Sequence, residues 1–360
     1  MILHARFWEI RDLESRTQGT TDTGESNVMN QVSPAAASAF ESRYPEAKFG
    51  DHLEAVRDQV AVTLPGPGER FRVAFVGQST YFEVCSQEAP SDVIEPKFIE
   101  TRSGADSYGW IRALREFAPH VIFVFRPEVV PHGLLKEFDA LVVGMLTEPL
   151  PRAGGKKNKD LERRLSDLKL ADASQCDRII AFEPNIIPAA STHFDVWRSM
   201  PLPVADSMFC DSLPLPSAPV RALFVGRSTP HRSNFLASSK HTLDLHHVEH
   251  GLFGDQLKEL SKQYFVAINL HNTPYPNFEN RVPLHLAMGN LVASEPLSPR
   301  NGLDPDLDFI EVHNSDDLWH LLHRVADDPQ RYDLVRARGR QKAENFRASV
   351  VYRRLLLDLL

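Results

Sequence analysis

The sequence predicts an α/β protein with two domains, each built on a parallel sheet whose strands alternate with helices. The length, 360 residues, exceeds the roughly 250–300 residues that one hydrophobic core usually serves. Short apolar runs alternate with segments of helical spacing along most of the chain. A short motif also recurs, as FVGQST at 75–80 and as FVGRST at 224–229, each time at the end of an apolar run. We interpret each copy as the end of the first strand of one domain.

Composition limits the classes of protein that need to be considered. Apolar residues make up 42% and charged residues 24%, which is typical of a globular protein. The formal net charge of −8 gives no general footprint for nucleic acid. Cys85, Cys176 and Cys210 lie far apart, without zinc or disulfide spacing. No apolar stretch approaches a membrane span, so we expect a cytoplasmic protein.

Residues 1–70 do not share the alternating pattern of the rest of the chain. A polar run covers 17–31, short helices are predicted at 35–40 and 52–62, and the Pro-Gly cluster LPGPGER follows at 64–70. We therefore expect an N-terminal appendage that is partly flexible.

The first predicted domain covers residues 71–205. Its strands are predicted from four short apolar runs: RVAFVG (72–77), HVIFVF (120–125), ALVVGML (140–146) and RIIAF (178–182). Helices are predicted at 109–118 and 160–173, where Leu161, Leu165 and Leu168 share one face.

The second predicted domain covers residues 206–345 and follows a proline-rich linker at 199–219. Its predicted strands are RALFVG (221–226), TLDLHHV (242–248), YFVAINL (264–270), NLVAS (290–294) and DFIEV (308–312), and its predicted helices are 255–263, 280–288 and a capped helix after Asn314. A terminal helix, 346–360, carries apolar residues that need a covering surface: Val350, Val351, Leu355, Leu356 and Leu359. We expect this helix to return to the N-terminal domain.

Two parallel-sheet domains in tandem suggest a ligand site between the carboxyl ends of their strands. A dinucleotide oxidoreductase would show G-x-G-x-x-G after its first strand, but each FVG motif here has a single glycine. The P-loop motif G-x-x-x-x-G-K-[ST] does not occur either. A nucleotide-sugar transferase uses both domains and needs neither motif.

Residues 266–349, together with FVGRSTPHR at 224–232, resemble the donor-binding half of group 1 glycosyltransferases of the GT-B fold, particularly the CgeB-like branch. The resemblance covers roughly residues 220–350, and TEPLPR at 147–152 is similar to a segment of that branch. It implies two Rossmann-like domains that face a cleft. It also implies transfer of a sugar from a nucleotide-sugar to an acceptor, without a cofactor. Fold alone does not determine the reaction.

The sequence departs from this family at the paired glutamates of the donor site. Counting back from Gly289, the two positions fall on Leu284 and Pro276, neither of which can bond a ribose hydroxyl. Glu279 is the nearest substitute and is followed by Asn280 and Arg281. The donor site is therefore rebuilt or idle.

Several side chains are candidates for binding the donor. The loop after the strand at 221–226 carries Gly226, Arg227, Ser228 and Thr229 and should precede a helix, whose free N–H groups favour a diphosphate. Arg232 and Arg281 could neutralise the leaving diphosphate. Glu279 could accept from sugar hydroxyls, and His250 and Gly251 lie where the resemblance implies a loop near the nucleotide. Each candidate also has a structural alternative. The loop at 226–229 could be a capped turn, and the two arginines could lie on the surface. Glu279 could cap the following helix, and His250 could be a structural histidine.

The candidates in the first domain lie on the acceptor side. Gln78, Ser79, Thr80 and Tyr81 follow its first strand and would contact the acceptor or the sugar. Glu148, after ALVVGML, is the candidate general base, and His193 is a second one. A salt-bridged loop glutamate is the alternative for Glu148.

The run Arg152–Lys169 carries seven basic and three acidic residues. It is either a solvated face or a patch for an anionic or lipid-linked acceptor, which would make the protein membrane-peripheral. No metal site is expected, because His246, His247 and His250 do not share a helix face. The sequence thus predicts a glycosyltransferase; a nucleotide-sugar epimerase or hydrolase, and a non-catalytic sugar-nucleotide binder, are the alternatives.

Overall fold

The computed structural model describes residues 62–101, 107–152, 154–155, 157–213, 220–240, 244–272 and 275–360. All of these belong to one compact unit, residues 52–360. The helix predicted at 35–40, almost all of the one predicted at 52–62, and most of the expected appendage lie outside the described residues.

The described strands are β1 (Phe71–Gly77), β2 (Ile94–Glu100), β3 (Val121–Phe125), β4 (Leu141–Leu146), β5 (Arg178–Ala181), β6 (Val196–Ser199), β7 (Ala222–Val225), β8 (Leu245–Val248), β9 (Val266–Asn269), β10 (Leu291–Ser294) and β11 (Ile310–Glu311). The α-helices are α3 (Ser79–Phe82), α4 (Ser107–Phe117), α5 (Lys159–Leu168), α6 (Ile187–Ala190), α7 (Pro230–Lys240), α8 (Gly254–Ser261), α9 (Arg281–Ala287), α10 (Ser315–Asp327), α11 (Asp333–Ala343) and α12 (Ala348–Leu359).

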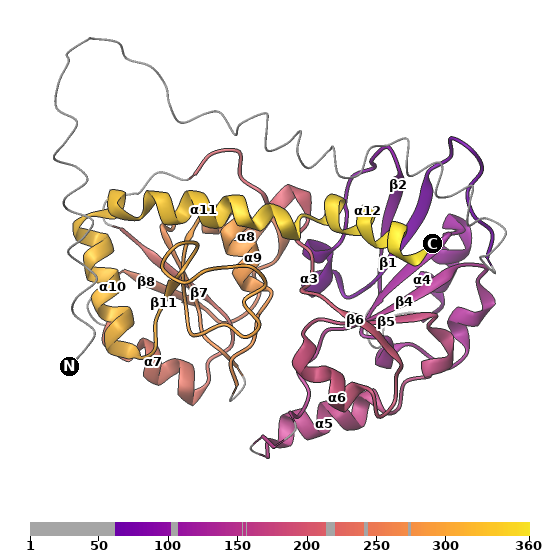
Figure 1. Cartoon of the computed structure of the whole chain (residues 1–360), viewed down its shortest axis with the longest axis horizontal. Helices are drawn as coiled ribbons and strands as arrows, with labels where there is room; N and C mark the ends of the chain where they lie inside the picture. The colour runs from indigo at the N-terminus through magenta and orange to yellow at the C-terminus, as the bar shows by residue number, and fades with distance from the viewer. Residues whose placement is uncertain are drawn as a thin grey trace, which may run out of the picture. The chain divides into compact units, whose positions relative to one another are not determined.

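These strands form two parallel sheets, which define an N-terminal and a C-terminal lobe (Figure 1). The N-terminal sheet has the order β2-β1-β3-β4-β5-β6, and the C-terminal sheet has the order β11-β10-β9-β7-β8. In each sheet the strand order reverses beside the first strand, between β1 and β3 and between β7 and β9. Ligands of open α/β sheets bind outside the carboxyl ends of strands at such points. The α/β class with two parallel-sheet domains, predicted from the sequence, is confirmed.

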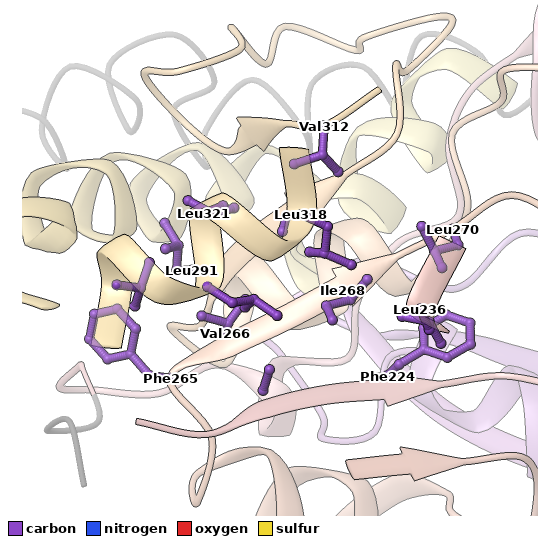
Figure 2. Packing of buried hydrophobic residues seen from close by; sticks show 14 of the residues in the cluster. Phe224, Leu236, Phe265, Val266, Ile268, Leu270, Leu291, Val312, Leu318 and Leu321 are labelled. Atoms are coloured by element: carbon purple, nitrogen blue, oxygen red, sulfur yellow. The ribbon is translucent and has the colours of Figure 1, made fainter. Parts of the chain in front are cut away.

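The core of the C-terminal lobe lies between its sheet and the helices α7 and α10. Val266 and Ile268 of β9 pack in one cluster with Leu318 and Leu321 of α10 (Figure 2). The helix begins where the sequence predicts, because the side chain of Asn314 accepts hydrogen bonds from the first free N–H groups of α10. The cap fixes where this helix begins, and its apolar face packs on the sheet.

The sequence analysis did not predict β2 and β6, and both are edge strands. Pro96 lies inside β2, where a missing N–H is tolerated because one side of an edge strand has no neighbour. β6 reads VWRS, and all four residues are half-buried. Neither β2 nor β6 contains the continuous apolar run that identifies the central strands.

The proline-rich segment after β6 is packed along the lobes through its described part, 200–213. The N–H of Val204 donates to Phe346 O (2.7 Å), and Val204 O accepts from the N–H of Ala348 (2.8 Å). The N–H of Ala205 donates to Val84 O (2.8 Å). This segment therefore connects the start of α12 to the N-terminal lobe.

Helix α12 packs on the N-terminal sheet through Tyr352. The ring of Tyr352 meets Phe75 of β1 and Phe123 of β3 at centroid distances of 4.6 and 4.9 Å. Its hydroxyl donates to Cys85 O (2.6 Å), and the side chain is fully buried. Leu355 is buried on the same helix. An aromatic residue, absent from the predicted apolar set, is thus the centre of this contact.

Replacing Tyr352 with phenylalanine should remove one hydrogen bond and leave the buried carbonyl of Cys85 without that partner. We expect Tyr352→Phe to lower the free energy of unfolding by about 1–3 kcal/mol, measured by urea denaturation. Tyr81→Phe, at a 58% exposed position, is the control and should change it little. Equal stability of Tyr352→Phe and the wild type would show that the hydroxyl contributes nothing.

Candidate functional site

A pocket of about 320 Å³ lies at the carboxyl ends of strands from both lobes. The N-terminal lobe contributes Thr147, Pro149, Arg164, Phe182 and Leu202; the C-terminal lobe contributes Gly226, Arg227, Arg232, Asn272, Asn277, Phe278, Glu279, Asn280, Arg281 and Pro283. These lining residues include four arginines and one carboxylate. The lining is therefore suited to an anionic ligand.

Gly226, directly after β7, makes room for two guanidinium groups. A Cβ at this position would lie 2.7 Å from Arg281 Nη1 and 3.3 Å from Arg232 Nη1. Any side chain would therefore displace at least one arginine. The single glycine of FVGRST lets the two cations converge at the end of the first strand of the lobe.

Glu279 is the carboxylate that holds these arginines together. It forms an ion pair with Arg281, lies 3.5 Å from Arg232 Nη2, and accepts from the N–H of Asn272 at 3.0 Å. Burial alone would raise the pKa of Glu279, but Arg281, Arg232 and the nearby His271 hold it below its ordinary value. The structure thus brings together three residues that the sequence predicted for the donor site.

Arg232 and Arg281 also organise the backbone around the pocket. Arg232 is 2% exposed; its Nε and Nη2 donate to Leu270 O at 3.0 and 2.7 Å, and its Nη1 donates to Arg227 O at 3.0 Å. Burial and the neighbouring Arg281 lower the pKa of Arg232 to about 10. Arg281 Nη1 donates to Val225 O at 2.9 Å. Arg232 is therefore mainly a brace between loops, while Arg227 is exposed.

The other predicted donor residues have varied positions. Thr229 Oγ1 accepts from the N–H of Arg232 at 3.2 Å and caps α7, and Ser228 Oγ lies 3.0 Å from a second serine hydroxyl. Asn280 lines the pocket. His250 and Gly251 are exposed and are not among the lining residues. The structure brings the loop and the Glu279–Arg281 segment together, and leaves His250 and Gly251 outside the pocket.

Three lining residues carry buried polar atoms that have no hydrogen-bond partner within the described residues. These atoms are Thr147 Oγ1, Arg164 Nε and Asn280 Oδ1. A buried polar atom without a partner costs about 1–3 kcal/mol. Polar atoms of this kind beside a pocket are available to hydrogen-bond with a ligand or with water.

The two candidate bases are both engaged elsewhere. Glu148 forms ion pairs with Arg164 (2.7 Å) and Arg126 (3.8 Å), and it is not among the lining residues although both its neighbours are. His193 Nε2 bonds to Ala171 O at 2.7 Å, also away from the lining. For Glu148 this geometry matches the salt-bridged alternative.

The predicted acceptor residues Gln78–Tyr81 lie at the start of α3 and are not among the lining residues either. The N–H of Ser79 donates to Glu100 Oε2 at 2.6 Å. Tyr81 meets Phe253 of the C-terminal lobe edge to face, with ring centroids 6.2 Å apart. Tyr81 thus makes a contact between the lobes that is separate from the pocket.

Sequence reasoning did not single out Thr147, Arg164 or Phe182 as site residues. Thr147 directly follows β4, and Phe182 directly follows β5. The position of these two at strand ends was a usable signal. Arg164 lies in α5 within a run of charged residues, and nothing in that run distinguishes it from its neighbours.

Within the ranges given above, no three His, Cys, Asp or Glu side chains are close enough to hold a metal ion. His246 Nδ1 lies 2.6 Å from Tyr264 Oη, and His247 Nε2 donates to Gly226 O at 2.8 Å. None of the described helices combines the length and the apolar character that crossing a bilayer requires.

The depressed pKa of Glu279 predicts a pH-dependent contribution to stability. The carboxylate should stabilise the folded protein fully above its unfolded value near 4.5, and this contribution should be lost as pH falls through the lower folded value. Glu279→Gln should therefore cost about 3 kcal/mol at pH 7 and less at pH 3, measured by urea denaturation. Glu259→Gln, an exposed control, should show no such trend. A constant difference between wild type and Glu279→Gln would refute this role.

No protein-family model matches the sequence, and no curated protein matches it at the sequence level. In structure, the chain is similar to HepE of Anabaena in complex with UDP-glucose, with a TM-score of 0.53 and 10% identity over 81% of this chain and 99% of that chain. HepE in complex with UDP and glucose gives a TM-score of 0.52 with the same identity and coverage. The resemblance to the CgeB-like branch stays a prediction. The two comparisons show the fold of this chain, which is the GT-B arrangement of two parallel-sheet domains.

Proposed function

We propose that the protein transfers a sugar from a nucleotide-sugar donor to an acceptor bound against the N-terminal lobe. The observation that carries this proposal is the arginine-rich pocket at the point where the order of the C-terminal strands reverses. The leaving group of such a transfer is a nucleoside diphosphate, whose charge increases as the glycosidic bond breaks. Guanidinium groups fixed beforehand at that place stabilise this charge.

The donor diphosphate is proposed to bind between the loop after β7 and the start of α9. Arg227 is exposed and lines the pocket there, and Arg281 has its guanidinium fixed by Glu279 and Val225. Asn280 Oδ1 can accept from a ligand hydroxyl. UDP-glucose is the first donor to test, because it is the ligand bound by the structurally similar HepE.

The pocket wall formed by the N-terminal lobe carries fewer cations than the donor side, which the C-terminal lobe forms. Arg164 is the cation of this wall, and its two terminal nitrogens pair with Glu148 at 2.7 Å and Asp160 at 2.8 Å. Its charge is thus already compensated, while its Nε and the Thr147 hydroxyl have no hydrogen-bond partner in the described part of the chain. A neutral, hydroxyl-bearing group fits this wall better than the anionic acceptor suggested by the basic run.

The described lining contributed by the N-terminal lobe contains neither a carboxylate nor a histidine. A transfer that inverts the sugar needs a general base for the acceptor hydroxyl. A retaining transferase can proceed without one. The lining therefore supports transfer without an enzymic base, with the departing diphosphate taking the proton.

Nucleotide release separates the proposed transfer from its alternatives. The protein would be incubated with UDP-, GDP- and dTDP-sugars, with and without a panel of hydroxyl-bearing glycan acceptors. Acceptor-dependent release supports transfer. Conversion or release without acceptor points to an epimerase or a hydrolase, and binding without turnover points to a sugar-nucleotide binder.

Arg281→Ala should weaken binding of the nucleoside diphosphate. One lost charge-assisted contact is worth about 1.5–3 kcal/mol, or roughly ten- to a hundredfold in affinity. Calorimetric titration of the ligand-free protein measures this directly. Arg115→Ala, which removes an exposed arginine of α4, is the control. Unchanged affinity in Arg281→Ala would remove this residue from the site.

Glu148→Gln distinguishes the two possible roles of this residue, a general base and a salt-bridged loop glutamate. A general base should lower turnover by about 10²–10⁴-fold when removed. Because its carboxylate pairs with Arg126 and Arg164, we expect a loss of less than about tenfold and unchanged donor affinity. A hundredfold loss in turnover with intact donor binding would instead identify Glu148 as the base.

A further inference from the structure

Arg152 of the N-terminal lobe crosses to a loop of the C-terminal lobe. Its Nη2 donates to Pro276 O at 2.7 Å, and its guanidinium lies over the ring of Tyr275, 5.1 Å from the ring centroid. Both partners belong to the segment between β9 and α9. This contact joins a side chain of one lobe to the main chain of the other.

The other partner of Arg152 is a buried carboxylate. Glu183 is 1% exposed, and its two oxygens lie 3.3 and 3.2 Å from Arg152 Nη2. Burial raises the pKa of Glu183, and Arg152 opposes this rise. Glu183 directly follows Phe182, which lines the pocket. Arg152 thus connects an anchored carboxylate of the N-terminal lobe to the loop of the C-terminal lobe.

The loop that Arg152 contacts forms much of the donor side of the pocket. Asn277, Phe278, Glu279 and Asn280 all line the pocket, and they directly follow Pro276. At the far end of this run, Glu279 is fixed by Arg281 and Arg232. Arg152 fixes the near end from the opposite lobe. The donor loop is therefore fixed at both ends, and the N-terminal lobe holds it at the near end through Arg152 and at the far end through Cys85, whose Sγ accepts from Asn280 Nδ2 at 3.1 Å.

We propose that Arg152 is a positioning residue that holds the loop 275–280 in the conformation that binds the donor. The nature of the ligand rests on the proposed function. The contact of Arg152 with Tyr275 and Pro276, called the tie below, does not. A loop that is only part of the time in the binding conformation lowers the apparent affinity in proportion. Loss of Arg152 should therefore weaken nucleotide binding although Arg152 is not among the lining residues.

Two variants break the tie in different ways. Arg152→Ala removes the guanidinium and leaves Glu183 buried without it, which could destabilise the lobe. Gly155→Ala changes no charge. It breaks the contact sterically, because the added Cβ would collide with the hydroxyl of Tyr275 and push that ring away from Arg152. Arg178→Ala, at an exposed arginine of β5, serves as the matched control.

The experiment combines hydrogen exchange of the ligand-free protein with calorimetric titration of UDP. We expect exchange in residues 275–281 to become about tenfold faster in both variants, and UDP affinity to fall about ten- to thirtyfold. Exchange in β1 and β3 should stay as in the wild type. Millimolar guanidinium ion should restore protection and affinity in Arg152→Ala but not in Gly155→Ala.

The outcomes separate the tie from the proposed function. Faster exchange in both variants, together with a wild-type protein that binds none of the nucleotides, would support the tie and reject the donor site. Unchanged exchange in both variants would overturn the proposal. If Arg152→Ala fails to fold, Gly155→Ala decides alone, and weaker binding without faster exchange would also reject the positioning role.

Discussion

The candidate site depends on one carboxylate, that of Glu279, whose side chain is only 14% exposed. Without Glu279, the guanidinium groups of Arg232 and Arg281 would repel each other beside Gly226, where the absence of a side chain lets them approach. With it, two cations are held close together and their remaining donors are directed to backbone carbonyls. The arrangement needs a glycine, two arginines and a glutamate at once, which explains why the loop after β7 and the segment before α9 form one unit.

The sequence predicted the central strands of both sheets because they are apolar runs buried on both faces. It also predicted α10, whose cap and apolar spacing agree. The edge strands β2 and β6 could not be recognised, since their residues are only partly buried and one of them contains proline. An edge position alone does not decide this outcome, because β8 and β11 are also edge strands and were predicted from the sequence.

For the site, sequence reasoning located the donor side better than the acceptor side. Gly226 and Glu279–Arg281 follow or precede regular elements, so their place at one end of the sheet could be inferred. The partner of each charge could not be inferred, because pairing depends on how distant segments meet. Glu148 illustrates this: it follows β4 as expected, yet its carboxylate turns to Arg164 of α5 and Arg126. Its two neighbours, Thr147 and Pro149, are the residues that line the pocket.

The contact of Tyr352 with β1 and β3 has a consequence for how the protein is made. The sheet of the N-terminal lobe is complete once β6 has been synthesised at Ser199, but Tyr352 of α12, which packs on this sheet, is synthesised only after the whole C-terminal lobe. Domains generally fold during synthesis in the order in which they leave the ribosome. While the C-terminal lobe is being translated, Phe75 and Phe123 of the N-terminal lobe therefore lack their contact with Tyr352. The packing of this lobe is completed only by α12, so the N-terminal lobe without α12 would leave Phe75 and Phe123 uncovered.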